Sequence, residues 1–150
     1  MNKLISTAML AASLSTLAVA LPARAADTAL MLPIAAAMAA NDAQSRLGDS
    51  VKFYFGDQPT PSVARKITSD KTSLRTNAFG KTAEKSCNWV FLSAMLALQK
   101  RANEVGADAV INIVSNFKEK VVSSQTEFEC HEGAIMSGVA LKGDFVKLAK

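Results

Sequence analysis

The sequence is poor in the residues that carry most enzyme chemistry. Its 150 residues include one histidine, two cysteines, one tryptophan and one tyrosine. With His131 as the only imidazole and the carboxylates scattered, few side chains could act as a general base. The seven glycines form neither a G-x-x-x-x-G-K-[ST] loop nor a G-x-S-x-G turn. These absences count against a P-loop ATPase and a Ser-His hydrolase, so we expect no enzyme activity.

The chain also lacks a strong excess of either charge. It has 17 Lys and Arg residues against 13 Asp and Glu, a formal net charge of +4. Two of the basic residues and none of the acidic ones lie in residues 1–25, so residues 26–150 carry +2. This excludes a strongly basic nucleic-acid binder. The charge is nevertheless uneven, because residues 52–101 carry +6 while residues 26–51 and 102–150 carry −2 each.

Residues 1–25 have the pattern of a secretory signal. A basic start at Lys3 is followed by an apolar run over residues 4–21 and by Ala23-Arg24-Ala25 as an A-x-A cleavage site. We therefore expect cleavage after Ala25 and a periplasmic or secreted mature protein without a transmembrane segment. An uncleaved membrane anchor is the alternative. No cysteine lies near the cut, so a lipid anchor is not expected.

The two cysteines, Cys87 and Cys130, are 43 positions apart. An isolated pair in an exported protein usually forms a disulfide, and we predict a Cys87–Cys130 bond. A catalytic thiol or a metal site is the competing interpretation. Neither C-x-x-C nor a second Cys/His pair at ligand spacing is present, which favours the disulfide.

A long amphipathic helix over residues 83–105 is the clearest predicted element. Thr82 can cap its start and Gly106 its end. Its apolar stripe consists of Phe91, Ala94, Met95, Leu98, Ala102 and Val105. A shorter N-terminal helix is predicted from Pro33 to about Leu47, after a flexible or extended lead-in over residues 26–32.

Strands are expected before and after the long helix in the sequence. Alternating, aromatic or β-branched segments predict them at residues 51–55, 109–114, 125–131 and 135–141, with an edge strand around residues 63–74. The apolar fraction of 49% is too high for a disordered chain. The expected fold is a single α+β domain over residues 26–150, with the long helix packed on a small antiparallel sheet.

Three side chains on the strand at residues 125–131 form a candidate metal site. Glu127, Glu129 and His131 alternate with a period of two, so they project from one face of the strand. Two carboxylates and an imidazole could bind a divalent ion, although a further ligand from outside the strand is normally needed. A solvated sheet face is the alternative, and no other cofactor is expected.

Basic residues also gather in the polar segment before the long helix. These residues are Arg65, Lys66, Lys71, Arg75, Lys81 and Lys85. Such a patch could bind an anionic partner, for example lipopolysaccharide or phospholipid headgroups. No aromatic residue interleaves with these charges before Phe79, which argues against single-stranded nucleic acid as the partner. A solvated polar loop is the alternative interpretation.

Several segments together resemble a family of small exported bacterial proteins that often carry the label "excinuclease ATPase subunit". They are VKFYFGDQ (residues 51–58), Cys87, A-x-x-x-G-A-D-A-V-x-N-I (102–113), E-C-x-x-G (129–133) and G-V-A-L-K-G (138–143). More distantly, the second half of the chain resembles the YbjQ-type fold associated with heavy-metal binding and the domain of the Rcs envelope-stress lipoprotein. This resemblance implies a helix on a small antiparallel sheet with a stabilising disulfide.

The predicted function is that of an exported, non-enzymatic protein that binds an envelope component or a partner protein. It depends on the export signal, the predicted disulfide and the absence of a catalytic constellation. A metal- or small-ligand-binding module that uses the strand around His131 is the second hypothesis, and a hydrolase is the third.

Overall fold

A computed structural model describes residues 27–150 of the chain. The predicted signal and its cleavage site after Ala25 lie outside the described residues. Within the described range, no helix is long and apolar enough to cross a membrane.

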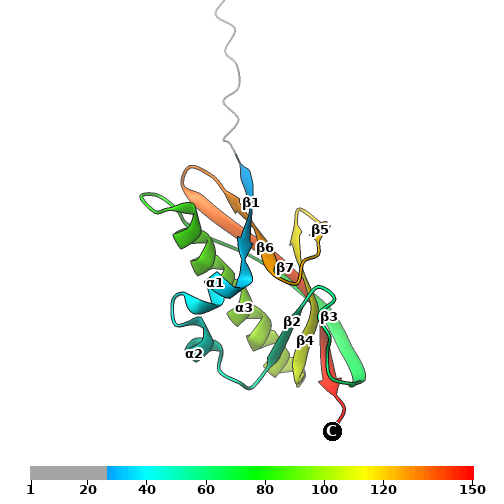
Figure 1. Ribbon diagram of the computed structural model, residues 1–150. Helices are drawn as coiled ribbons and strands as arrows, with labels where there is room; N and C mark the ends of the chain where they lie inside the picture. Colours follow the sequence, from blue (N-terminus) through cyan, green and yellow to red (C-terminus); the bar gives the residue numbers. More distant parts are fainter. Residues whose placement is uncertain (1–26) are drawn as a thin grey trace, which may run out of the picture.

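The described residues form a mixed sheet of seven strands with helices against one face (Figure 1). The strands are β1 (Thr28–Pro33), β2 (Lys52–Phe55), β3 (Val63–Asn77), β4 (Ala109–Phe117), β5 (Lys120–Val122), β6 (Glu127–Glu132) and β7 (Met136–Leu148). Their order is β1-β6-β7-β4-β2, with β5 paired to β4 and β3 paired to β7. The β2–β4 pair is parallel, and the other pairs are antiparallel.

Strand β7 is the central strand of this sheet, because it pairs with β3, β4 and β6. One of its edges pairs with β3 over almost the full length of both strands. The other edge pairs with β6 near its start, where His131 faces Gly138, and with β4 further along, where Ala109 faces Val146. The long β3–β7 pair therefore has β1 and β6 attached near the start of β7, and β4, β2 and β5 attached further along. Strand β3 is an edge strand.

The predicted fold class is wrong in its description of the sheet. The sheet is neither small nor purely antiparallel, because it has seven strands and a parallel β2–β4 pair. The N-terminal helix is also two short helices, α1 (Ile34–Ala39) and α2 (Ala43–Leu47). Asn41 and Asp42 adopt positive φ angles of 56° and 55° between them, a left-handed conformation that interrupts a helix. Residues 28–33, expected as a lead-in, are strand β1.

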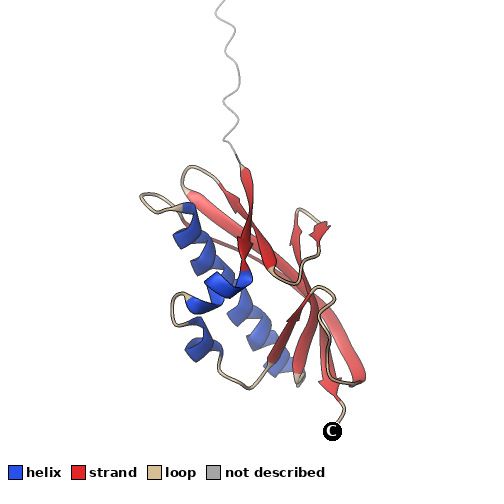
Figure 2. Ribbon diagram, viewed as in Figure 1, coloured by secondary structure: helices blue, strands red, loops and turns tan. Residues whose placement is uncertain are grey.

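Helix α3 (Ala83–Val105) occupies the range that the apolar stripe indicates, and it lies along the sheet (Figure 2). The Thr82 side chain accepts a hydrogen bond from the amide of Lys85, and Gly106 ends the helix with a φ of 71°. Its own residues Phe91, Met95 and Leu98 are fully buried. Burial of this face, rather than intrinsic helix propensity, supplies most of the stability of α3.

The core lies between α3 and the sheet, and the disulfide crosses it. Phe91 of α3 stacks on Phe128 of β6 with ring centroids 4.2 Å apart. Cys87 and Cys130 are both fully buried and joined by a disulfide, with their Cα atoms 5.9 Å apart. The predicted Cys87–Cys130 bond is therefore confirmed. It links the second turn of α3 to β6.

The pairing of strand β4 with β7 contains an irregularity, at which the two strands approach closely. Asn112 has a φ of 50°, and the pairing of β4 with β7 shifts between Ile111 and Val114. The adjoining position on β7 is Gly143, where an added Cβ would lie 2.7 Å from Cγ1 of Val110. The close approach of the two strands therefore requires glycine at this position.

We expect Gly143→Ala to lower the free energy of unfolding by about 1–3 kcal/mol, because the methyl group overpacks against a stiff, buried valine. The matched control is Gly138→Ala on the same strand, where an added Cβ would meet its nearest neighbour at 3.5 Å. This control should be neutral or stabilising by up to about 1 kcal/mol. Urea unfolding of both variants provides the comparison. Equal effects of the two substitutions would contradict the packing argument.

Candidate binding groove

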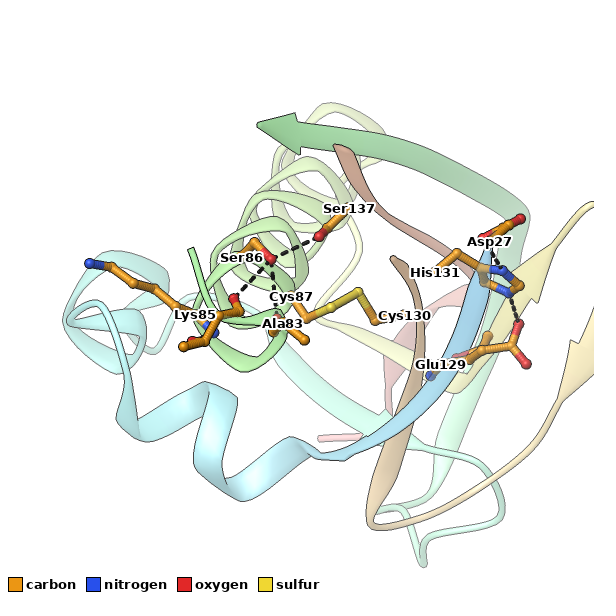
Figure 3. Close-up of a disulfide and its surroundings, with 11 residues drawn as sticks. Asp27, Ala83, Lys85, Ser86, Cys87, Glu129, Cys130, His131 and Ser137 are labelled. Atoms are coloured by element: carbon orange, nitrogen blue, oxygen red, sulfur yellow. Dashed lines mark hydrogen bonds and ion pairs between the residues drawn. A yellow bond between two sulfur atoms is a disulfide. The ribbon is translucent and has the colours of Figure 1, made fainter. Parts of the chain in front are cut away.

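The face of the sheet that points away from α3 carries the polar side chains of β6 and β7. Cys130 points to α3, whereas His131 and Glu129 project from the opposite side of β6 (Figure 3). On β7 the buried residues Val139 and Leu141 belong to the core, so the alternating residues Gly138, Ala140 and Lys142 face the other way. We call this second side of the sheet the open face.

His131 is held between two carboxylates and an aromatic ring on the open face. Its Nε2 lies 2.8 Å from Oε1 of Glu129, and its Nδ1 lies 3.0 Å from Oδ1 of Asp27. The imidazole stacks on Phe117 of β4 with ring centroids 3.4 Å apart and planes 10° apart. The His131 side chain is only 16% exposed. These contacts fix the imidazole and leave neither ring nitrogen without a partner.

The candidate metal ligands are not arranged as a metal site. Asp27 and Glu129 approach opposite nitrogens of the His131 ring, so one ion could not bind the imidazole together with both carboxylates. Glu127 is exposed and takes part in no ion pair between described residues. In the part of the chain that the structure describes, no three His, Cys, Asp or Glu side chains are placed to hold a metal ion.

The six residues of the predicted basic patch do not form one surface. Lys66 is paired with Asp144 at 2.7 Å, and Lys71 is paired with Glu119. Lys81 and Lys85 lie instead beside Trp89 at the start of α3. Arg65 lies near the other end of β3, opposite Lys147. Only Lys71 and Arg75 line hollows on the open face.

Two adjoining hollows on the open face share Arg75 and Phe117. The smaller has a volume of about 160 Å³ and reaches Asp27, His131 and Gly138. The larger has a volume of about 430 Å³ and extends over Ala140 to Lys71 and Lys118. Together they form a groove between β3 and the end of β4, which we call the open-face groove. Its floor is β7, where Gly138 and Ala140 leave the space unfilled.

Arg75 is the distinctive charge of this groove. The other cations at its rim are paired, Lys71 with Glu119 and Lys118 with Asp27 at 3.5 Å. Arg75 takes part in no ion pair among residues 27–150. A Cβ added at Gly138 would lie 3.5 Å from Cγ of Arg75 and 3.7 Å from the Phe117 ring, so the two side chains flank the same gap. A guanidinium beside an aromatic wall can bind an anion that carries an apolar group.

Two carboxylates of the open face, Glu119 and Asp144, have a lowered pKa. Hydrogen bonds from Lys71 and Asn116 lower the pKa of Glu119. Partial burial alone would raise the pKa of Asp144, but hydrogen bonds from Lys66, Ser69 and Asn112 outweigh it and lower this pKa. Glu119 and Asp144 therefore neutralise Lys71 and Lys66, and Arg75 is the groove-lining cation that no ion pair among residues 27–150 neutralises.

The lowered pKa of Asp144 predicts a loss of stability in acid. Because the folded-state pKa is below the unfolded value of about 3.9, this stabilisation is present above that pH and is lost as the pH falls through the folded pKa. We expect Asp144→Asn to cost on the order of 1–2 kcal/mol at pH 7 and less at about pH 3. Urea unfolding at both pH values tests this. A cost that is the same at both would contradict the assignment.

Sequence reasoning missed Asp27, Phe117 and Gly138 as members of the groove. Asp27 adjoins the predicted signal and reaches His131 only through the pairing of β1 with β6. Phe117 directly precedes a charged run, Lys118-Glu119-Lys120, at the end of a strand. An aromatic residue at a strand end next to charge was the one local signal of a binding surface.

Comparison of the chain with protein-family models gave no match, and searches of curated proteins and of solved structures gave no significant match.

Proposed function

We propose that the protein is an exported, non-enzymatic binding module of the bacterial envelope, and that its open-face groove binds a small organic anion. The expected ligand carries a carboxylate or phosphate next to an apolar group. The observation that carries this proposal is Arg75, a guanidinium that lies between two hollows and has no acidic partner among residues 27–150.

The groove has the features that such a ligand needs. Arg75 provides a fork of donors for a bidentate contact with a carboxylate or phosphate. Phe117 provides an apolar wall that the stacked His131 holds in place. Glycine and alanine on β7 leave the floor open, so a ligand can approach the guanidinium without displacing side chains.

The predicted export signal and the family resemblance support the envelope as the location. The Cys87–Cys130 bond is compatible with an oxidising compartment, where an isolated buried disulfide persists. The pattern of residues 1–25 is that of an export signal. The resemblance to small exported proteins points the same way.

Substitution of Arg75 tests the proposal. We expect phenyl phosphate and benzoate to bind the protein measurably in calorimetric titrations, and benzylamine, a cation of similar size, not to bind. Arg75→Ala should weaken binding roughly 10- to 100-fold, because a charge-assisted contact contributes about 1.5–3 kcal/mol. Arg75→Lys should retain part of the affinity, since it keeps the charge but loses the bidentate geometry.

The matched control is Arg65→Ala, on the same strand and outside the groove. Arg65 is exposed and makes no ion pair within the described range. It should leave binding unchanged. Equal losses in the two variants would indicate a general charge effect and would contradict a specific role for Arg75. Failure of both aromatic anions to bind would contradict the groove as a site for this class of ligand.

A further inference from the structure

Three exposed apolar side chains lie at one end of the molecule. None of them lines the larger hollow of the open-face groove. Phe79 in the β3–α3 connection is 76% exposed, Ile135 in the β6–β7 connection 63%, and Met136 at the start of β7 41%. The amide of Ala78 donates a hydrogen bond to the carbonyl of Ile135 at 2.9 Å, which joins the two connections. We call these three side chains the apolar tip.

A basic cleft adjoins the apolar tip. It has a volume of about 280 Å³ and is lined by Asn41, Lys81, Lys85 and the half-exposed Trp89. The guanidinium of Arg46 lies 5.7 Å from the centre of the Trp89 ring. Between described residues, none of Arg46, Lys81 and Lys85 is engaged in an ion pair. The acidic side chain of Glu84 lies in the same first turn of α3.

The N-terminal strand begins at this same end. Thr28 of β1 pairs with Glu132, which directly precedes the β6–β7 connection. Figure 1 shows the start of β1 near the β6–β7 connection, and the hydrogen bond from Ala78 to Ile135 joins that connection to the one between β3 and α3. Residues 1–26, which include the predicted export signal, precede β1. Before the cleavage expected after Ala25, an export signal held in a membrane would therefore leave this end nearest to the lipid surface.

We propose that the apolar tip docks the protein on a membrane surface that carries anionic phospholipids. Phe79 and Ile135 enter the boundary between headgroups and acyl chains, and Trp89 lies at headgroup level, where its amphipathic ring is favoured. Lys81, Lys85 and Arg46 contact the lipid phosphates. This docking uses neither Arg75 nor Phe117, so it can be tested separately from the proposed ligand, and Met136 is the one side chain of the apolar tip that also lines the smaller hollow of the open-face groove.

The test is co-sedimentation with phosphatidylcholine vesicles, with and without phosphatidylglycerol. It uses the protein purified after export, with its N-terminus determined by mass spectrometry. We expect binding to the anionic vesicles. Phe79→Ser combined with Ile135→Ser should weaken it at least about tenfold, because two apolar side chains no longer leave water. Lys81→Gln combined with Lys85→Gln should weaken it about fivefold per lysine, and only on anionic vesicles.

The control is Val121→Ser, which removes an apolar side chain that is 57% exposed on β5. It should leave vesicle binding unchanged, and circular dichroism should show that every variant is folded. The proposal is overturned if the wild-type protein binds neither kind of vesicle, or if the Phe79/Ile135 variant binds as well as the wild type. A wild-type dimer that this variant dissociates in sedimentation, without loss of vesicle binding, would instead assign the apolar tip to a second copy of the chain.

Discussion

Removal of the Cys87–Cys130 disulfide is expected to lower the free energy of unfolding by about 4 kcal/mol. The bond closes a loop across 43 sequence positions, and this loop contains most of α3, all of β4 and β5, and part of β6. Without it, the unfolded chain gains the conformational entropy of that long loop. For a domain of this size, the melting temperature should fall by on the order of 10–20 °C.

Thermal and urea unfolding of the oxidised protein and of the Cys87→Ala/Cys130→Ala variant measure this effect. The variant avoids reductant and leaves no thiols to form new bonds. Because both sulfur atoms are fully buried, the small cavities left by the substitutions add to the entropic term. A loss below about 1 kcal/mol would show that the folded protein does not depend on the bond.

Phe128→Ala is expected to cost about 3–5 kcal/mol, the other large effect on stability. Phe128 is 1% exposed and stacks on Phe91, whose ring lies in turn 6.1 Å from that of Phe55. Truncation therefore leaves a cavity where α3 meets β6, and the surrounding backbone can close it only in part. The disulfide next to it restrains both elements and limits their relaxation.

The matched control is Phe79→Ala, the same substitution at a side chain that is 76% exposed. It should change stability by no more than about 0.5 kcal/mol. Urea unfolding of both variants gives the difference. Similar effects at the two positions would mean that Phe128 does not belong to the core as described.

The elements that could be predicted from sequence are those whose stability has a local signature. The range of α3 follows from an apolar stripe with a cap at each end, Thr82 and Gly106. The disulfide follows from two cysteines in a chain whose first residues predict an export signal. Strand β4 follows from its β-branched residues, although it extends to Phe117, beyond the predicted end at residue 114.

Strand β1 and the mixed sheet depend on partners far away in the chain. Residues 28–33 have no strong strand pattern, and they become a strand by pairing with residues 127–132 of β6. The parallel β2–β4 pair joins residues separated by the whole of β3 and α3, which no local pattern encodes. Strand β3 is polar along most of its length because it is an edge strand with one face only half-covered.

The candidate site was only partly accessible to sequence reasoning for a similar reason. Counting basic residues located a positive segment, but it could not show that Asp144 and Glu119 neutralise Lys66 and Lys71. Both acids come from strands outside the segment. Arg75 is distinguished from its neighbours only by the ion pairs that the others make.

Binding of a small organic anion at Arg75 in the open-face groove can be tested directly by backbone amide chemical shifts. Recorded during a titration with phenyl phosphate, these shifts report both binding and its location. We expect saturable shifts that concentrate at Arg75, Phe117 and Gly138, and their loss in the Arg75→Ala variant. Shifts confined to another surface, or no saturable shift at all, would contradict it.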